Sequence, residues 1–214
     1  MKFLAAGEHF YEWHLYDVYT HSIKSISYCP YNQHIRLTLL LHDIGKPFCK
    51  TTDENKQDHF YGHPQKSVEI ASVVLKRLKV SNELFKKVIT LIEIHDKKIS
   101  LNDESIKFWL RTLGEELFFD LMEVKLADMN SHNLEFAGES LALIQKIKQR
   151  ATEIIANNEP YRISDLKING NDLVDLGYVG ADIKNELERL IVEVSKDPTL
   201  NSKTKLISIA KKDR

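Results

Sequence analysis

A histidine and an aspartate stand side by side at the end of an apolar segment, in the stretch LLLHDIGKP. His42 follows Ile35 by seven residues and Leu39 by three, so in a helix these residues share one buried face, with Asp43 beside them. A buried imidazole and a buried carboxylate each need a partner, and one divalent cation can satisfy both. For this dipeptide alone, a His-Asp pair that caps a core helix is the alternative, so the remaining histidines decide between the two interpretations.

Other histidines and an aspartate fall at or near the ends of expected helices. His63 precedes Pro64, which suits the first turn of a helix, while two further apolar stripes with helical spacing lead to His95 and Asp128. For each residue alone a hydrogen-bonded structural role remains the alternative. Taken together, these imidazoles and carboxylates suit a divalent transition metal with open positions for water and substrate. The candidate set is His21, His42, Asp43, His63, His95 and Asp128.

Several neighbouring residues are candidates for contacts with a substrate. Lys46 follows the His-Asp pair and could neutralise a phosphoryl oxygen, with a solvated turn lysine as the equal alternative. His14 and His59 could bind substrate or support the ligands. The remaining histidines, His9, His34 and His132, are expected to be surface or packing residues.

The elements that position these residues are expected to be helices. Apolar positions recur with helical spacing, and repeated alternating runs separated by hairpin signals are absent from the sequence, which predicts an all-α fold. Gly45 is expected to end the helix before it and Pro47 to prevent its resumption, and the polar segment 48–62 is expected to be an exposed loop. The expected capping residues of later helices are Ser81, Asn102 and Asn201.

Length and composition limit the class of protein. The 214 residues, 43% of them hydrophobic, suffice for one well-buried core with a small appendage. A net charge of -1 argues against a strongly basic nucleic-acid-binding domain. The two cysteines, Cys29 and Cys49, lack metal-site spacing and fit a reducing compartment, so we expect a cytoplasmic protein without a membrane span.

The stretch LLLHDIGKP resembles the signature of the HD superfamily of metal-dependent phosphohydrolases, whose H...HD...D pattern is matched by His21, His42, Asp43 and Asp128. The chain is also similar to the C-terminal half of bacterial tRNA nucleotidyltransferases, the family of CCA-adding enzymes and poly(A) polymerases. That similarity is carried by HLYDVYTHS (14–22), HFYGHPQKS (59–67), LIEIHD (91–96), DLKINGNDLVDLGYVGADI (165–183) and DPTLNSK (197–203). The resemblance implies an HD helical bundle in residues 1–160 and a small helical tail in 161–214.

The resemblance further implies a phosphohydrolase that holds one or two divalent ions, of Mn, Fe, Co, Ni, Zn or Mg. One ion would be held by the HD pattern residues, with Asp43 and Lys46 serving catalysis, and a second ion would add His63 and His95. If no second ion is bound, the latter two residues would bind substrate. Nucleotides, or RNA ends with a 2′-phosphate or 2′,3′-cyclic phosphate, would be the substrates.

Two alternatives remain open from the sequence. The chain could be a non-catalytic module that binds tRNA or another RNA or acts as a scaffold, or the C-terminal part of a split tRNA nucleotidyltransferase. Nucleotide addition requires strands that carry a carboxylate pair after a Gly-rich turn, and nothing before His21 matches that pattern. We therefore expect that this chain lacks the nucleotide-adding head. The oligomeric state stays open.

Overall fold

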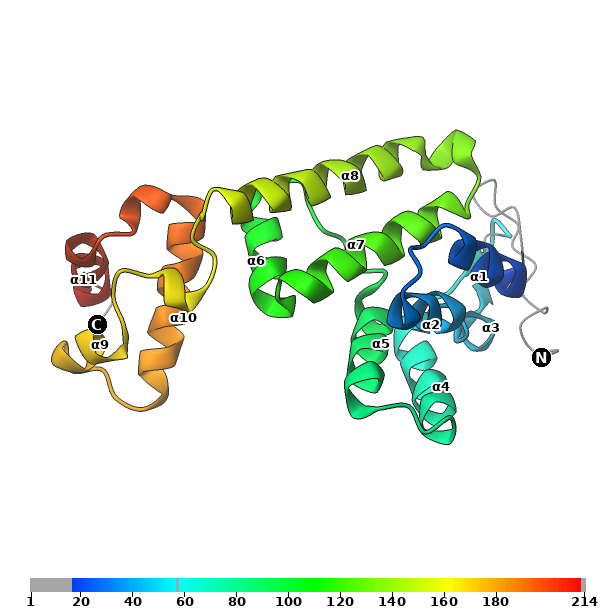
Figure 1. Ribbon diagram of the computed structural model, residues 1–214, viewed down its shortest axis with the longest axis horizontal. Helices are drawn as coiled ribbons and strands as arrows, with labels where there is room; N and C mark the ends of the chain where they lie inside the picture. The colour runs from blue at the N-terminus through cyan, green and yellow to red at the C-terminus, as the bar shows by residue number, and fades with distance from the viewer. Residues whose placement is uncertain (1–16, 57, 213–214) are drawn as a thin grey trace. The chain divides into compact units, whose positions relative to one another are not determined.

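The computed structural model describes residues 17–56 and 58–212, and in this part of the chain helices dominate (Figure 1), which confirms the predicted all-α fold. The helices of the first part are α1 (Val18–Ser27), α2 (Gln33–Leu41), α3 (Lys46–Cys49), α4 (His63–Arg77), α5 (Asn82–Ile94), α6 (Asp103–Leu113) and α7 (Glu115–Asn130). They are followed by α8 (Leu134–Ala156), α9 (Gly170–Asp175), α10 (Ala181–Lys196) and α11 (Lys203–Lys212), with short 3-10 turns at Ile163–Asp165 and Pro198–Leu200. The described strands, β1 (Thr51–Thr52) and β2 (Asp58–His59), form one antiparallel hairpin.

The chain divides into two compact units. Unit 1 contains the described residues up to Lys98 together with Glu116–Lys146, and unit 2 contains Ile99–Glu115 and the described residues from Ile147 onward. The division differs from the boundary expected at residue 160, because α6 and the end of α8 group with the tail. A buried lysine of α6 explains this grouping: the amine of Lys107 lies 2.9 Å from a carboxylate oxygen of Glu159 and 3.4 Å from the carbonyl oxygen of Ser195 in α10.

The core of unit 1 forms where α2, α4 and α5 pack together. Leu41, Ala71, Leu75, Val88 and Ile92 form one buried cluster between these helices. Figure 1 shows α4 and α5 side by side as an antiparallel pair. Because the cluster fixes the last turn of α2 against both partners, the residues that follow Leu41 are held against the start of α4 and the end of α5.

Capping residues set the helix boundaries largely where the sequence indicated. The side chains of Ser81 and Asn102 accept hydrogen bonds from the backbone N–H groups of Leu84 and Ser105, which confirms them as N-caps of α5 and α6. Pro64 lies in the first turn of α4, as expected. Asn201 was expected to cap α11, but its side chain instead bridges the N–H of Lys167 and the carbonyl of Asp165.

Two expectations for the segment after the His-Asp pair are wrong. Pro47 does not prevent helix formation but occupies the first turn of α3, where the missing N–H costs no hydrogen bond. Segment 48–62 is not simply an exposed loop, because it contains the end of α3 and the hairpin β1–β2. Asp58 in this hairpin is buried and accepts a hydrogen bond from the Thr52 hydroxyl, with the Lys50 amine 2.8 Å away.

Unit 2 has its own apolar core between α9, α10 and α11. The buried residues are Leu166, Ile168, Leu173, Leu190, Ile191, Val194, Leu206 and Ala210. Within the described residues, none of the helices combines the length and the apolar character needed to cross a bilayer.

Candidate metal centre

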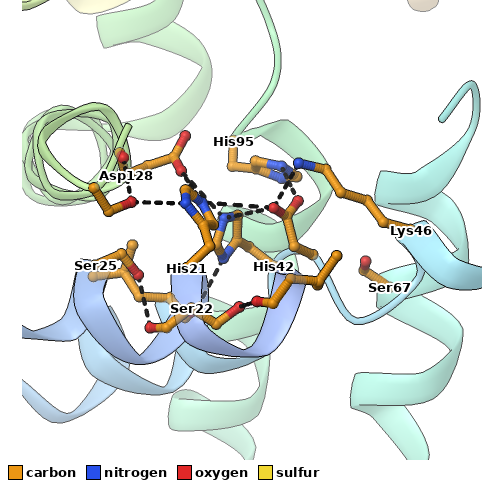
Figure 2. A network of polar contacts seen from close by, with 12 residues as sticks. His21, Ser22, Ser25, His42, Lys46, Ser67, His95 and Asp128 are labelled. Atoms are coloured by element: carbon orange, nitrogen blue, oxygen red, sulfur yellow. Dashed lines mark hydrogen bonds and ion pairs between the residues drawn. The ribbon is translucent and has the colours of Figure 1, made fainter. Parts of the chain in front are cut away.

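Six candidate ligands, in or at the ends of five helices, come together in unit 1. Figure 2 labels four of them, His21, His42, His95 and Asp128. His21 lies in α1, His42 and Asp43 at the end of α2, His63 at the first residue of α4, His95 at the C-cap of α5, and Asp128 in α7. Helix ends carry most of them because apolar stripes anchor each helix in the core and leave the next residue at its edge. The five residues other than Asp128 are all buried.

The His42-Asp43 pair occupies the centre of this group and is almost fully buried, with 1% of each residue exposed. The Nε2 atom of His42 lies 3.3 Å from Oδ2 of Asp43 and 3.4 Å from Oδ1 of Asp128. Among the described residues, neither Nε2 of His42 nor Oδ1 of Asp43 has a hydrogen-bond partner. Two buried polar atoms without partners at one place are costly unless a further group binds them.

Backbone carbonyls orient three of the imidazoles. The Nδ1 atoms of His42, His63 and His95 lie 2.8, 3.0 and 2.7 Å from carbonyl oxygens three residues earlier in the chain. Because a carbonyl only accepts, Nδ1 must carry the donated proton, and Nε2 of each ring is turned toward Asp43. This is the arrangement in which a neutral histidine binds a metal through Nε2.

A second set of contacts joins α1 to α7. Nε2 of His21 lies 2.8 Å from Oδ1 of Asp128, and its Nδ1 lies 2.9 Å from the hydroxyl oxygen of Ser131. His21 also approaches Oδ2 of Asp43, at 3.7 Å. The carboxylate of Asp128 therefore lies between His21 and His42 and can share a cation with both.

The electrostatics of the group favour a positive charge at its centre. Burial opposes protonation of His42, but the negative charges of Asp43 and Asp128 outweigh burial and raise its pKa to about 10. Burial raises the pKa of the Asp43 and Asp128 carboxyl groups, but the facing imidazoles lower it by more. The net pKa of both groups is therefore well below the usual range. Burial lowers the pKa of His95, so this ring is neutral. A divalent cation can replace the compensating proton of His42.

Lys46 contacts Asp43 and lies on the opposite side of the group from Asp128 in Figure 2. Its amine lies 2.7 Å from Oδ2 of Asp43. Burial lowers the pKa of Lys46, but the adjacent Asp43 carboxylate raises it by more. The net pKa lies above the ordinary value for lysine, so the amine stays charged. Lys46 is therefore not a solvated turn lysine but a cation at the edge of the group.

The donor atoms fall into two overlapping sets that could each hold an ion. One set is His21, His42 and Asp128, the other is His42, Asp43 and His95, and within each set the ligand atoms lie within 4.8 Å of one another. His63 adjoins the second set, because its Nε2 lies 3.4 Å from Oδ1 of Asp43. Mixed imidazole and carboxylate donors, together with the two unpartnered atoms, fit a divalent transition metal.

The structure separates the other histidines. His132, expected to be a surface or packing residue, lies against His21 with ring centroids 4.7 Å apart, and its Nδ1 lies 2.9 Å from the Asp128 carbonyl oxygen. His34 pairs with Asp120 at 2.7 Å. His59 contacts Asp53 at 3.1 Å and stacks on Tyr61 instead of joining the cluster. His14 and His9 lie outside the described residues.

Two supporting residues escaped the sequence analysis. The amine of Lys125 donates hydrogen bonds to the carbonyl oxygens of His95 and Lys97, which ties α7 to the end of α5. Ser67 in α4 accepts a hydrogen bond from the backbone N–H of Gly45 at 2.9 Å. Lys125 has no sequence pattern that distinguishes it from an ordinary helix surface residue, whereas Ser67 is the last residue of the stretch HFYGHPQKS (59–67). For His132, the available signal was its spacing of one helical turn from Asp128.

Comparisons with known proteins give a consistent result. Residues 63–210 match the family described as tRNA nucleotidyltransferase domain 2 putative. The A-adding tRNA nucleotidyltransferase of Deinococcus radiodurans is 27% identical over 122 residues, which are 54% of this chain and 28% of that protein. The chain thus matches less than a third of the length of this curated relative. No solved structure matches. Since the family match covers more than half of the sequence, the chain belongs to the family of tRNA nucleotidyltransferase domain 2.

Proposed function

We propose that unit 1 is a metal-dependent phosphohydrolase of the HD type, which acts on nucleotides or on 2′-phosphates and 2′,3′-cyclic phosphates at RNA ends. The observation that carries this proposal is the buried pair of unpartnered donor atoms, Nε2 of His42 and Oδ1 of Asp43, inside a ring of imidazoles and carboxylates. When bound there, a divalent ion supplies Lewis-acid activation of water and of the phosphoryl group.

The residues of the chain have distinct roles in this proposal. His21, His42, Asp43 and Asp128 would hold the ion; Oδ2 of Asp43 faces His42 and its Oδ1 faces His63. Lys46 neutralises a non-bridging phosphoryl oxygen with an amine that already lies 2.7 Å from Asp43. His63 and His95 would either complete a second metal position or, by sharing one additional proton between their Nε2 atoms, donate a hydrogen bond to the phosphate.

The test is hydrolysis of bis(p-nitrophenyl) phosphate and of 2′,3′-cyclic AMP by the purified chain, with Mn²⁺, Co²⁺, Ni²⁺, Fe²⁺, Zn²⁺ or Mg²⁺ and with a chelator. We expect turnover that requires an added ion and is abolished in His42→Ala. His34→Gln is the matched control, because it removes a histidine that pairs with a carboxylate outside the cluster. Turnover that persists in chelator would reject the proposal, and so would the absence of turnover with every one of these ions.

A second candidate function follows from the comparisons. The family match and the Deinococcus relative, of which only 28% is covered, support a domain that holds tRNA for a separate nucleotidyl-transferring domain. In this case the chain binds tRNA, His42→Ala binds tRNA as tightly as the parent, and no phosphate ester is hydrolysed with any ion. Gel-shift titration with tRNA alongside the turnover assay distinguishes the two functions.

A further inference from the structure

A groove of about 510 Å³ lies at the start of α2, outside the candidate metal centre. Ile26, Leu37 and Leu40 give it an apolar lining, and Tyr31 lies at its edge with 93% of its surface exposed. Arg36 also lines the groove and precedes His42 by six residues, which corresponds to a rotation of about 240° around α2. The two side chains therefore leave the helix on different faces.

Arg36 carries a positive charge into this groove. Its guanidinium carbon lies 4.7 Å from the centroid of the Tyr31 ring, and its Nε is buried without a hydrogen-bond partner among the described residues. A guanidinium that lines a groove attracts an anionic oxygen, to which its N–H groups can donate charge-assisted hydrogen bonds. The guanidinium also holds the Tyr31 ring from one side, so the exposed ring offers its remaining face to a ligand.

Two amide side chains add hydrogen-bonding groups to the same groove. The Oδ1 atom of Asn32 accepts hydrogen bonds from the backbone N–H groups of His34 and Ile35, which leaves its NH₂ group to donate elsewhere. Gln33 is exposed beside it. A flat aromatic ring, an apolar floor, amide groups and one arginine are together the features with which proteins bind an unpaired nucleotide.

We infer that this groove binds one unpaired nucleotide of an RNA strand, with its base stacked on Tyr31 and its phosphate at Arg36. Charge complementarity selects this occupant over an uncharged apolar segment, because the positively charged Arg36 lines the groove. The inference rests on RNA as the proposed partner, but it does not depend on the metal centre. A free nucleotide offers the same base and phosphate, so the experiment compares the two sources.

The experiment measures the fluorescence anisotropy of a labelled ten-nucleotide single-stranded poly(A) RNA with the full chain in chelator, where the proposed hydrolysis cannot occur. Tyr31→Ala should raise the Kd about tenfold, within the range for loss of one stacked base, and Tyr31→Phe should restore binding. Arg36→Ala should raise the Kd. It should also reduce the slope of log Kd against log salt concentration by roughly 0.7, the value for one phosphate contact on a single strand. Tyr31→Ala should leave that slope unchanged.

Phe108→Ala is the matched control. Phe108 is 46% exposed in unit 2 and also lies beneath an arginine, with the guanidinium carbon of Arg111 at 5.9 Å from its centroid. The acidic Glu104 lines the adjoining groove, which disfavours a phosphate. This variant should bind the RNA like the parent. Because Tyr31 is almost fully exposed, thermal unfolding of Tyr31→Ala should match that of the parent.

Three results would overturn the inference. The first is an unchanged Kd in both Tyr31→Ala and Arg36→Ala, and the second is no binding of the strand by the parent. The third is a change of oligomeric state in Tyr31→Ala, measured by sedimentation, which would assign the groove to a second copy of the chain. Competition with AMP distinguishes the RNA strand from free nucleotide as the ligand. If AMP displaces the strand when both are present at equal concentration, the groove binds free nucleotide. A Kd at least tenfold weaker for AMP would support the RNA strand.

Discussion

His63 and His95 face each other with their Nε2 atoms 3.2 Å apart, although each ring already donates its Nδ1 proton to a backbone carbonyl. Two nitrogen lone pairs at this distance repel unless a proton or a cation lies between them. The pair is therefore suited either to bind an ion beside Oδ1 of Asp43 or to share a proton donated toward a phosphate.

His63→Ala and His95→Ala are each expected to reduce metal-dependent hydrolysis by about tenfold or more, which corresponds to about 1.4 kcal/mol in the barrier. In either role the lost nitrogen interacts with the reacting phosphate or with an ion that does. Turnover relative to His42→Ala, combined with the metal content per chain, measures the effect. Parental turnover in both variants while His42→Ala is inactive would show that the two histidines are structural.

At the scale of elements, the contact between Gly45 and α4 determines where the His42-Asp43 pair lies. A Cβ atom added to Gly45 would lie 2.6 Å from the carbonyl oxygen of His63 and 2.6 Å from the backbone nitrogen of Ser67. Both atoms belong to the backbone of α4 and cannot move aside independently. The glycine is thus required for close approach, since its backbone has an ordinary helical conformation at φ -81°.

Gly45→Ala is expected to lower the free energy of unfolding by about 1–3 kcal/mol, because α4 must shift to accommodate the methyl group. Urea unfolding measures this change. Gly138→Ala is the matched control: this helical glycine has open space around its Cβ position, so the substitution should stabilise α8 by about 0.5–1 kcal/mol. Equal stability of Gly45→Ala and the parent would contradict the packing described for α2, α3 and α4.

In unit 2, an ion-pair network joins α6 to the end of α8. Arg150 donates two hydrogen bonds to Asp103, at 2.8 and 2.6 Å, and lies 2.9 Å from Glu159, which also pairs with Lys107. The hydrogen bond from Arg150 lowers the pKa of Asp103. Burial raises the pKa of Glu159, but Lys107 and Arg150 lower it more.

The network predicts a pH dependence of stability. Both folded-state pKa values lie below the unfolded values of 3.8 and 4.5, so the stabilisation is complete above about pH 4.5 and is lost as the pH falls through the folded pKa values. Urea unfolding between pH 6 and pH 3 should show a shallower decline in the double variant Asp103→Asn/Glu159→Gln than in the parent. Glu69→Gln, which removes an exposed pair with Lys66, should follow the parent. The same slope in all three proteins would refute a role of the network.

At the scale of the whole molecule, the described residues contain strands only in the hairpin β1–β2, each strand of which has two residues. Nucleotidyl transfer requires a pair of carboxylates that hold Mg²⁺ and a nucleotide triphosphate. The carboxylates of Asp43 and Asp128 are already surrounded by histidines, a donor set that favours transition metals over Mg²⁺.

We therefore expect the isolated chain to incorporate no labelled CTP or ATP into tRNA. The assay uses purified chain, tRNA lacking its terminal nucleotides and each labelled triphosphate, with Mg²⁺ and Mn²⁺. A tRNA nucleotidyltransferase in a parallel reaction verifies the substrate. Incorporation by the chain alone would mean that another carboxylate site exists within it.

The sequence alone was sufficient to predict the all-α class and the starts of α4, α5 and α6, because helical periodicity and capping residues are local signals. The same signals singled out six candidate ligands, whose role as metal ligands stays a prediction. Proximity is not local: the approach of His21 to Asp128, 107 residues apart, and the placement of His132 beside His21 depend on how α1 and α7 pack. Likewise, the place of α6 in unit 2 follows from a buried lysine whose partners are 52 and 88 residues away. Such placements depend on the burial of apolar faces and the pairing of charges across the folded chain, which sequence spacing does not encode.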